Sequence, residues 1–337
     1  MGKTIAINDI NKTNKEFEKL CRMTQKTLKK HLVKELQKLG KKEVISDKGY
    51  IYSKGTFPVL ICAHMDTVHE NTPKIITYTE GKISSPQGIG GDDRCGVYII
   101  LQILKKIDCH VAFFEDEESG GVGSDLFTVT DYCKQMDVKF VIEFDRMNQN
   151  DAVFYRCDNE EFEEFITKEF FETNYGSFTD ICNICPVIGV AGVNISCGYY
   201  KQHTKEEYVV LKEMETVITE AIKLLERTDT SIKYEYIEAK YTYSSYGSYY
   251  GNYYFNKYID NKYKTKTTSW YSTKEEWEVY FTLNGEEIID YAYGSTLEEA
   301  FYDFMTAYPE VCYADIMYFE QVLNKEDRDK NGKIYDR

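Results

Sequence analysis

Five short segments of this sequence each carry histidine, aspartate or glutamate, the residue types that bind divalent metal ions. In chain order they are residues 64–68 (HMDTV), 91–93 (GDD), 116–120 (DEESG), 143–145 (EFD) and 201–204 (KQHT). Imidazole and carboxylate groups suit zinc, with cobalt or manganese as alternatives. His64 and Asp66 stand two positions apart at a strand end, so both side chains are expected to face one side, where Asp66 can accept a hydrogen bond from the His64 ring. The residue types therefore predict a metal site.

Four of the five segments follow an apolar, strand-like run directly or after a short loop. The pattern predicts strands at 50–52, 59–62, 75–78, 111–114, 140–144 and 187–193, and helices at 15–39, 97–104, 160–171 and 206–226. Strands separated by helices predict an α/β fold, a three-layer sandwich whose central sheet is mixed and mostly parallel. Sites in such folds form outside the carboxyl ends of the strands, which is where the segments are expected to lie.

The 337-residue chain changes character near residue 230, because 20 of its 30 tyrosines lie beyond that point. We expect a catalytic domain at 1–230, a Tyr-rich linker or set of exposed strands at 231–274, and a small α+β domain at 275–337. In that last part we expect strands at 277–283, 287–293 and 314–319 and a helix at 296–306, with Asn284-Gly285 as a hairpin turn. The Tyr-rich region either covers the appendage or offers a surface to a partner.

Composition narrows the classes of function. The net charge of −15 and the absence of a sizeable basic patch argue against binding to nucleic acid. No apolar run approaches the roughly 18–20 residues of a membrane span, and no export signal is visible at the N-terminus, so we expect a cytoplasmic protein with reduced cysteines. The pair Cys182 and Cys185 has no second pair at zinc-ribbon spacing and is expected to be two buried thiols.

Residues 327–334 (DRDKNGKI) match the first eight positions of an EF-hand loop. The sequence ends at Arg337, before the position of the bidentate glutamate, so we expect no calcium site there.

The order HMDTV, GGDD, EDEESGG, EFD and GYYKQHTKEEY resembles the co-catalytic dinuclear zinc exopeptidase superfamily, which includes peptidase T, carboxypeptidase G and the single-domain zinc aminopeptidases. The resemblance covers residues 15–228 and is specific, because five motifs occur in the right order. It implies two metal ions bridged by Asp92, one also held by His64 and Asp145 and the other by Glu118 and His203.

The resemblance further implies that Glu117 is the general base acting on the water between the metals and that Asp66 fixes the His64 ring. Without metal, the three ligand carboxylates would repel one another by several kcal/mol per pair at an effective dielectric constant of about 20. Two divalent ions offset that repulsion and leave about one positive charge, which a bridging hydroxide would cancel.

The sequence departs from peptidase T and carboxypeptidase G in one respect. Only 58 positions separate Asp145 from His203, which leaves no room for the lid and dimerisation domain that those enzymes carry there. We therefore expect a monomer. The oxyanion-stabilising donor of the lid must be replaced, and the candidates for this contact or for substrate contacts are Tyr200, Tyr199, Arg146 and Asn194.

These observations predict a dinuclear zinc peptidase that removes residues from a terminus of short peptides, most simply as an aminopeptidase. The resemblance implies that an aspartate rather than a glutamate at the fourth ligand position, here Asp145, is more frequent in the aminopeptidase-like branches of the superfamily. Two alternatives stay open: hydrolysis of a non-peptide amide such as an N-acyl amino acid, and a non-catalytic binding protein that retains the fold. The side-chain preference, the native metal and the role of residues 231–337 are not determined by the sequence.

Overall fold

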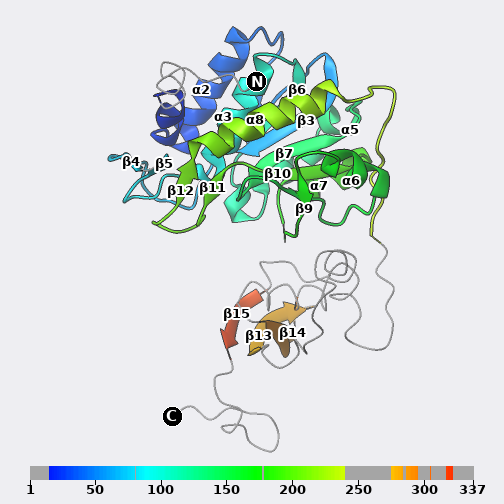
Figure 1. Ribbon diagram of the computed structural model, residues 1–337. Helices are drawn as coiled ribbons and strands as arrows, with labels where there is room; N and C mark the ends of the chain where they lie inside the picture. The colour runs from blue at the N-terminus through cyan, green and yellow to red at the C-terminus, as the bar shows by residue number, and fades with distance from the viewer. Residues whose placement is uncertain are drawn as a thin grey trace, which may run out of the picture. The chain divides into compact units, whose positions relative to one another are not determined.

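In a computed structural model, eight strands of the first unit, residues 1–240, form one mixed sheet (Figure 1). The structure describes residues 15–79, 81–176, 178–239, 275–283, 286–294, 304 and 316–321. In sheet order the strands are β1 (Ile45–Asp47), β2 (Tyr50–Ser53), β6 (Cys109–Phe114), β3 (Phe57–His64), β7 (Val141–Arg146), β10 (Gly192–Ser196), β8 (Asp151–Val153) and β9 (Glu172–Thr173). The central neighbours β6, β3, β7 and β10 run parallel, whereas β1 pairs antiparallel with β2, β2 with β6, and β8 with β10; the edge strand β9 runs parallel to β8.

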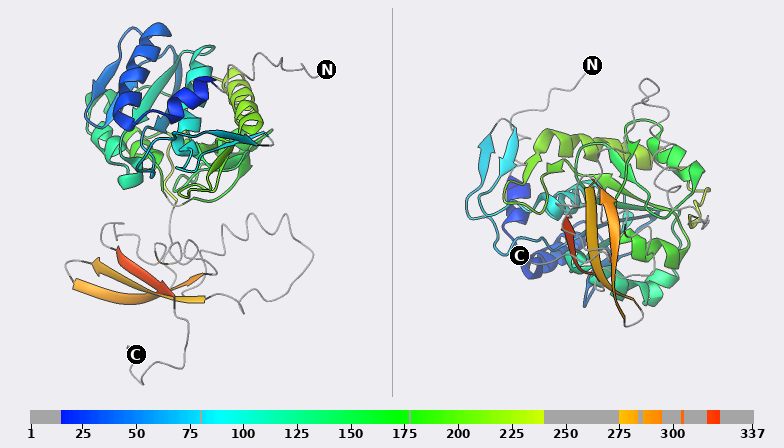
Figure 2. Two further views of the ribbon diagram at one scale, coloured as in Figure 1. Left: turned by 90° about the vertical axis from the view of Figure 1, so that its left-hand side faces the viewer. Right: turned by 90° about the horizontal axis from the view of Figure 1, so that it is seen from below.

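Both faces of this sheet are covered, which explains why its central strands are continuous apolar runs. One face packs against helices α2 (Gln25–Lys38), α3 (Gly91–Leu104), α6 (Glu160–Thr167) and α8 (Leu211–Glu226). The other face packs against α4 (Val122–Thr128), α5 (Asp131–Lys134) and α7 (Ile181–Ile188). The predicted three-layer α/β sandwich is therefore confirmed, and Figure 2 shows the layers from two further directions.

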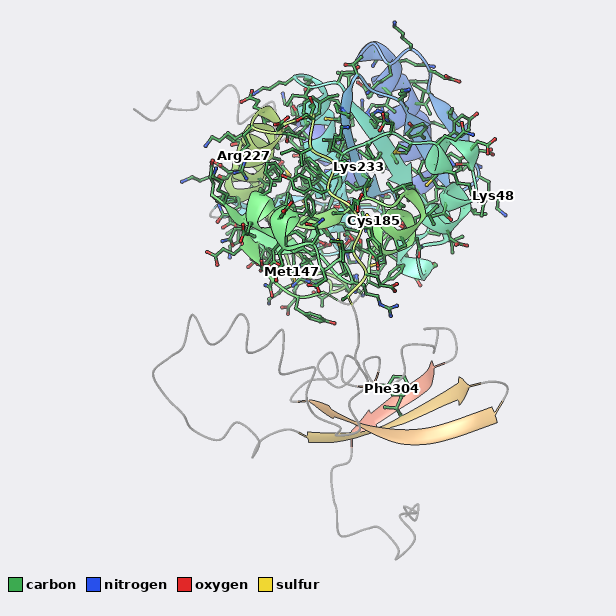
Figure 3. All side chains as sticks on the ribbon, turned by 90° about the vertical axis from the view of Figure 1, so that its right-hand side faces the viewer. Lys48, Met147, Cys185, Arg227, Lys233 and Phe304 are labelled. Carbon is green, nitrogen blue, oxygen red and sulfur yellow. The ribbon has the colours of Figure 1, made fainter. Side chains whose placement is uncertain are left out.

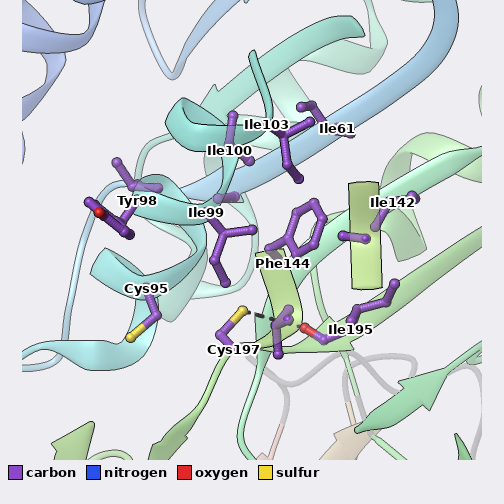
Figure 4. Close-up of a cluster of buried hydrophobic side chains, with 14 of the residues drawn as sticks. Ile61, Cys95, Tyr98, Ile99, Ile100, Ile103, Ile142, Phe144, Ile195 and Cys197 are labelled. Carbon is purple, nitrogen blue, oxygen red and sulfur yellow. Dashed lines mark hydrogen bonds between the residues drawn. The ribbon is translucent and has the colours of Figure 1, made fainter. Parts of the chain in front are cut away.

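Helix α3 lies directly on the sheet and fixes one end of the site. Its Ile99 and Ile103 project toward Ile142 and Phe144 of β7, and all four side chains are fully buried (Figure 4). Burial of each such side chain contributes about 1.5–3 kcal/mol. The N-terminus of α3, which carries Asp92, is thereby held against the carboxyl ends of β3 and β7.

A second, four-stranded antiparallel sheet lies beside the first. Its order is β11 (Tyr199–Tyr200), β12 (Tyr208–Val210), β5 (Lys82–Ser84) and β4 (Thr77–Thr79). The strand β12 corrects the helix expected at 206–226: Tyr208–Val210 pair with β5, and the helix begins at Leu211. The β-branched valines at 209 and 210 favour this extended start.

Two other predicted elements differ from the structure. The helix expected at 15–39 is interrupted at residues 22–24, where the Thr24 side chain accepts a hydrogen bond from the Thr27 N–H and caps α2. The strand expected at 187–193 starts only at Gly192. Residues 181–188 form α7 because their apolar side chains recur at helical spacing and pack on the sheet, and Gly189 ends the helix with a left-handed conformation.

The second unit comprises residues 241–337 and contains a three-stranded antiparallel sheet, β14 (Glu286–Gly294), β13 (Glu275–Leu283) and β15 (Ile316–Gln321). Strands were expected at all three places. Val279 and Phe304 are buried in this unit. The expected helix at 296–306 apart from Phe304, the Tyr-rich segment beyond residue 239 and the EF-hand-like segment lie outside the described residues.

No helix among the described residues is long and apolar enough to cross a membrane. The cysteines at 182 and 185 lie on α7 as free thiols; Cys185 is buried and Cys182 partly so.

A buried histidine on β6 makes folding stability depend on pH. His110 is 4% exposed, and its Nδ1 lies 3.1 Å from the Tyr52 hydroxyl. Burial, assisted by Lys41 and Lys54, lowers the pKa of His110 from 6.5 to about 4. Between these pH values the unfolded chain binds a proton that the folded chain excludes, so this contribution to stability is present above pH 6.5 and is lost as the pH falls toward 4.

We therefore predict that His110→Asn, which keeps a hydrogen-bonding group near the Nδ1 position, flattens this part of the pH profile. The free energy of unfolding of the wild type should fall by on the order of 3 kcal/mol more than that of the variant between pH 7 and pH 4. Denaturant titrations of both proteins measure the difference. Parallel profiles would contradict the assignment.

Candidate active site

The five segments singled out in the sequence meet at the carboxyl edge of the central sheet. His64 is the last residue of β3, and Asp145 lies near the end of β7 (Figure 1). Glu117 and Glu118 form a 3-10 turn, η1 (Glu117–Ser119), two residues after β6. Asp92 is the second residue of α3, where the backbone of Asp92 and Asp93 is not helical, and the peptide bond between them is cis. His203 follows β11 in a turn where its own φ is +62°.

His64 is held by carboxylates at both ring nitrogens. Its Nδ1 lies 3.1 Å from Asp66 Oδ1, and its Nε2 lies 3.0 Å from Asp92 Oδ1 and 3.3 Å from Asp145 Oδ1. Asp66 also accepts the backbone N–H groups of Glu117 and Glu118, each at 3.0 Å. The Asp66 carboxylate therefore fixes the His64 ring and η1 with the same two oxygens.

The second oxygen of Asp92 faces the other histidine. Asp92 Oδ2 lies 3.3 Å from His203 Nε2, and that nitrogen lies 3.0 Å from Glu118 Oε2. The two oxygens of Asp92 thus point to two different imidazoles, one buried and one 54% exposed at its side chain. The remaining oxygen of Glu118, Oε1, is buried and has no hydrogen-bond partner among the described residues.

The pKa shifts of the clustered side chains indicate an excess of negative charge at this site. Although burial opposes it, the carboxylates of Asp145, Asp66 and Asp92 raise the pKa of His64 well above its usual value. Hydrogen bonds to Asp92 and Glu118 raise the pKa of His203 to about 10. Burial raises the pKa of Glu118 and Asp145. A metal ion offsets the same excess of negative charge without protons.

The donor set and its spacing fit zinc. Ligand atoms about 2 Å from one tetrahedral zinc ion are about 3.3 Å apart, which is close to the distances around both histidines. Ligand atoms of His64, Asp92 and Glu118 lie within 4.8 Å of one another, as do those of His64, Asp93 and Asp145. Asp93 is the poorer ligand of the second group, because its oxygens already accept the N–H groups of His64 and Gly96.

Asp145 is held in place by neighbours from two other elements. The Thr179 hydroxyl donates to Asp145 Oδ2 at 2.8 Å. Asn194 on β10 accepts the Asp145 N–H and donates to the Asp145 carbonyl oxygen, both at 2.9 Å, and also donates to the Tyr155 hydroxyl. Asn194, expected as a substrate or oxyanion contact, is thus used in the scaffold.

A cavity of about 160 Å³ opens over the cluster. Met147, whose side chain is labelled in Figure 3, lies in the loop after β7. The lining residues are Asp92, Glu117, Glu118, Asp145, Arg146, Met147, Tyr155, Gly176, Phe178, Tyr199, Gln202 and His203. The lining combines acidic groups and the exposed imidazole of His203 with apolar groups of Met147, Tyr155 and Phe178, which are available for a substrate side chain.

The two neighbouring tyrosines considered as oxyanion donors differ in position. Tyr199 is buried, lines this cavity, and directs its hydroxyl to Asp145 Oδ1 at 3.4 Å. Tyr200 does not line the cavity: its hydroxyl donates to Glu213 at 2.5 Å and its ring stacks on Tyr208. Alternation along β11 sends the two side chains to opposite faces, so of these two candidates Tyr199 is the one that lies at the cavity and Tyr200 is not. Arg146 lines the cavity while its Nε lies 3.4 Å from Asp151.

Sequence reasoning missed Glu207, which is fully buried. Its Oε1 accepts the N–H of Asp92 at 2.9 Å, and its Oε2 accepts the N–H of Gly90 at 2.8 Å and contacts His69 Nε2 at 2.8 Å. One segment therefore supplies His203 to the Asp92 carboxylate and Glu207 to the Asp92 backbone. An acidic residue four positions after a candidate ligand was the available signal.

Two more buried acids lie behind Asp145 and were not singled out as site residues. Glu143 accepts the N–H of Ile181 at the start of α7, and Asp180 precedes that helix. Burial raises the pKa of Asp180 to about 7 and the pKa of Glu143 well above its usual value.

Comparison with known proteins finds one peptidase family and several peptidases of similar fold. Residues 49–179 match Peptidase family M28. The fold is similar to aminopeptidase PepT from Bacillus cereus ATCC 10987, at 17% identity and a TM-score of 0.51 over 64% of this chain and 97% of that one. It is also similar to a tripeptidase from Staphylococcus aureus, at 14% identity and a TM-score of 0.51 over 64% of this chain and 97% of that one. No curated protein sequence matches this chain.

The archaeal aminopeptidase APDkam598 from Desulfurococcus kamchatkensis gives the same result. Its identity is 15% and its TM-score 0.51, with 66% of this chain and 96% of that chain covered. At such identities the three structures establish the fold, and the match to the peptidase family covers the segments that carry His64, Asp92, Glu118 and Asp145.

The Glu207 contacts predict a role in metal binding that is separable from folding. Glu207→Gln replaces one acceptor oxygen by an amide that cannot accept a backbone N–H, so the loop carrying Asp92 loses a fixed contact. We expect the affinity of the metal-free protein for zinc to fall by about 10–100-fold, measured by calorimetry. Glu206→Gln is the matched control, because Glu206 is exposed and pairs only with Lys201 among the described residues. Equal zinc affinity in the two variants would contradict this role.

Proposed function

We propose that the protein is a dinuclear zinc aminopeptidase acting on short peptides, on the premise that the match of residues 49–179 to Peptidase family M28 and the peptidase-like fold of the first unit reflect membership of the zinc exopeptidase superfamily. The observation that carries the proposal is the position of Asp92, whose two oxygens face His64 and His203 separately. A carboxylate so placed can bridge two ions.

In this proposal His64 and Asp145 hold one zinc ion, Glu118 and His203 hold the other, and Asp92 holds both. When bound, the zinc ions supply Lewis acidity, which polarises a substrate carbonyl and lowers the pKa of water. Cobalt or manganese would suit the same ligands. Asp66 keeps the His64 ring in one orientation through its 3.1 Å contact to Nδ1.

Glu117 is the proton carrier in this scheme. It lines the cavity, and its backbone is anchored by Asp66, so its position is fixed without its carboxylate being used for anchoring. Burial raises the pKa of Glu117 well above its usual value, which strengthens it as a base. It takes a proton from the attacking water and delivers it to the leaving amine.

The acidic lining of the cavity supports cleavage at the amino terminus of the peptide substrate. Asp145, Glu117 and the neighbouring ligand carboxylates favour an α-ammonium group over an α-carboxylate. Arg146 is the observation in favour of a second candidate, because it is the lining residue with a permanent positive charge. Were its guanidinium to hold a substrate carboxylate, the enzyme would act on C-terminal residues or on N-acyl amino acids.

Blocked peptides test the proposal. We expect the zinc-loaded protein to cleave tripeptides with a free amino terminus and an amidated carboxyl terminus, but not the N-acetylated, free-acid counterparts. Glu117→Gln, which removes the proton acceptor at nearly constant volume, should lower kcat by about 10²–10⁴-fold with zinc content unchanged. Cleavage of only the N-acetylated peptides, or release of acyl groups, would favour the second candidate. Two bound zinc ions without turnover would indicate a binding protein.

The two tyrosines provide a matched pair for the oxyanion contact. Tyr199→Phe removes the hydroxyl that faces the cavity and should lower kcat by at least about tenfold with KM and zinc content little changed. Tyr200→Phe removes a hydroxyl that faces Glu213 and should retain most of the activity. Steady-state kinetics on one peptide substrate measure both. Equal losses would show that neither hydroxyl acts on the reacting carbonyl.

A further inference from the structure

A second and larger cavity adjoins the proposed catalytic centre. Its volume is about 560 Å³, against about 160 Å³ for the cavity over the metal ligands. Glu118 lines both cavities, and Asp66 lines the larger one. The other walls come from residues 67–73, residues 88–90, the residues before and at the start of α2, and the turn at 116–119. Both cavities thus reach the Glu118 side chain.

The basic side chains that line the larger cavity, Arg94 and His69, already have hydrogen-bond partners. Arg94 is buried and donates through its terminal nitrogens to the backbone oxygens of Met65, Asp66 and Met23, at 2.8, 3.2 and 3.2 Å. His69 directs its Nε2 to the buried Glu207 at 2.8 Å. Neither side chain is placed to neutralise an acid across the cavity.

Two lining acids, Glu70 and Asp116, are not paired with a basic side chain among the described residues. Glu70 is exposed and takes part in no hydrogen bond or ion pair among the described residues. Asp116 is half-buried, and the side-chain contact it makes is neutral: Oδ1 accepts from Gln25 Nε2 at 2.9 Å. Neither is a proposed metal ligand, and Asp116 stands two residues before Glu118 on the same wall. The larger cavity is therefore polar and carries an excess of negative charge.

We infer that this cavity binds the part of the peptide beyond the scissile bond and favours a lysine or arginine there. The inference rests on the proposed function. The small cavity accommodates one terminal residue, the reacting bond lies beside Glu118, and the departing peptide occupies the larger space, where Glu70 and Asp116 attract a positive side chain. Peptides with a basic second residue are accordingly the preferred substrates.

Three tripeptides that differ only at the second residue test this: X-Lys-Gly, X-Gln-Gly and X-Glu-Gly, with X held constant. We expect kcat/KM to fall in that order, with about a tenfold or larger difference between the lysine and glutamate peptides at low salt and a smaller one at high salt. The double variant Glu70→Gln, Asp116→Asn should reduce the lysine-to-glutamine ratio by about threefold or more. This ratio of two kcat/KM values is unaffected by a general loss of activity in the double variant.

Glu164→Gln, Asp137→Asn is the control, because it removes the same charge at two acids that do not line this cavity. It should leave the ratio as in the wild type. Cleavage of all three peptides at equal kcat/KM, or a ratio unchanged in the cavity variant, would overturn the inference and leave the proposed function standing. Failure to cleave any peptide or a single-residue anilide would overturn the proposed function, and the inference with it.

Discussion

The local structure of the site depends on one buried aspartate, Asp92, which is held through both its side chain and its backbone. The Asp92 side chain faces His64 and His203, and its backbone N–H is held by Glu207. Its position at the N-terminus of α3 is in turn set by apolar packing of that helix on β3 and β7. The cost of gathering carboxylates in a buried place is large unless cations offset it. The surrounding core supplies the rigidity that keeps these groups together.

Much of this could be predicted from the sequence because the relevant signals are local. Continuous apolar runs indicated the buried strands of the central sheet, which the fold confirms, and the motif order indicated a zinc exopeptidase, in keeping with the match of residues 49–179 to Peptidase family M28. The candidate ligands follow strand ends, so the parallel topology alone brings them to one edge. Their roles as metal ligands remain a proposal.

The parts that could not be predicted depend on contacts between distant segments or on which way a side chain faces. Glu207 is an ordinary acid in an acidic helix-like stretch until β12 pairs with β5 and brings it beneath Asp92. Tyr199 and Tyr200 are the same residue type and differ only in the face of β11 from which their side chains project. The apolar run at 181–193 contains a helix and a strand, and only the packing of α7 on the sheet decides where one ends.

The unequal burial of the two histidines makes the two halves of the proposed metal centre different. The His64 side chain is 1% exposed, whereas that of His203 is 54% exposed and stands in a turn. Solvent and chelators reach the His203 half first, so an ion held there would exchange quickly, and one held by His64 slowly. A purified sample could then retain a single tightly held ion and need free zinc in the buffer to become fully competent.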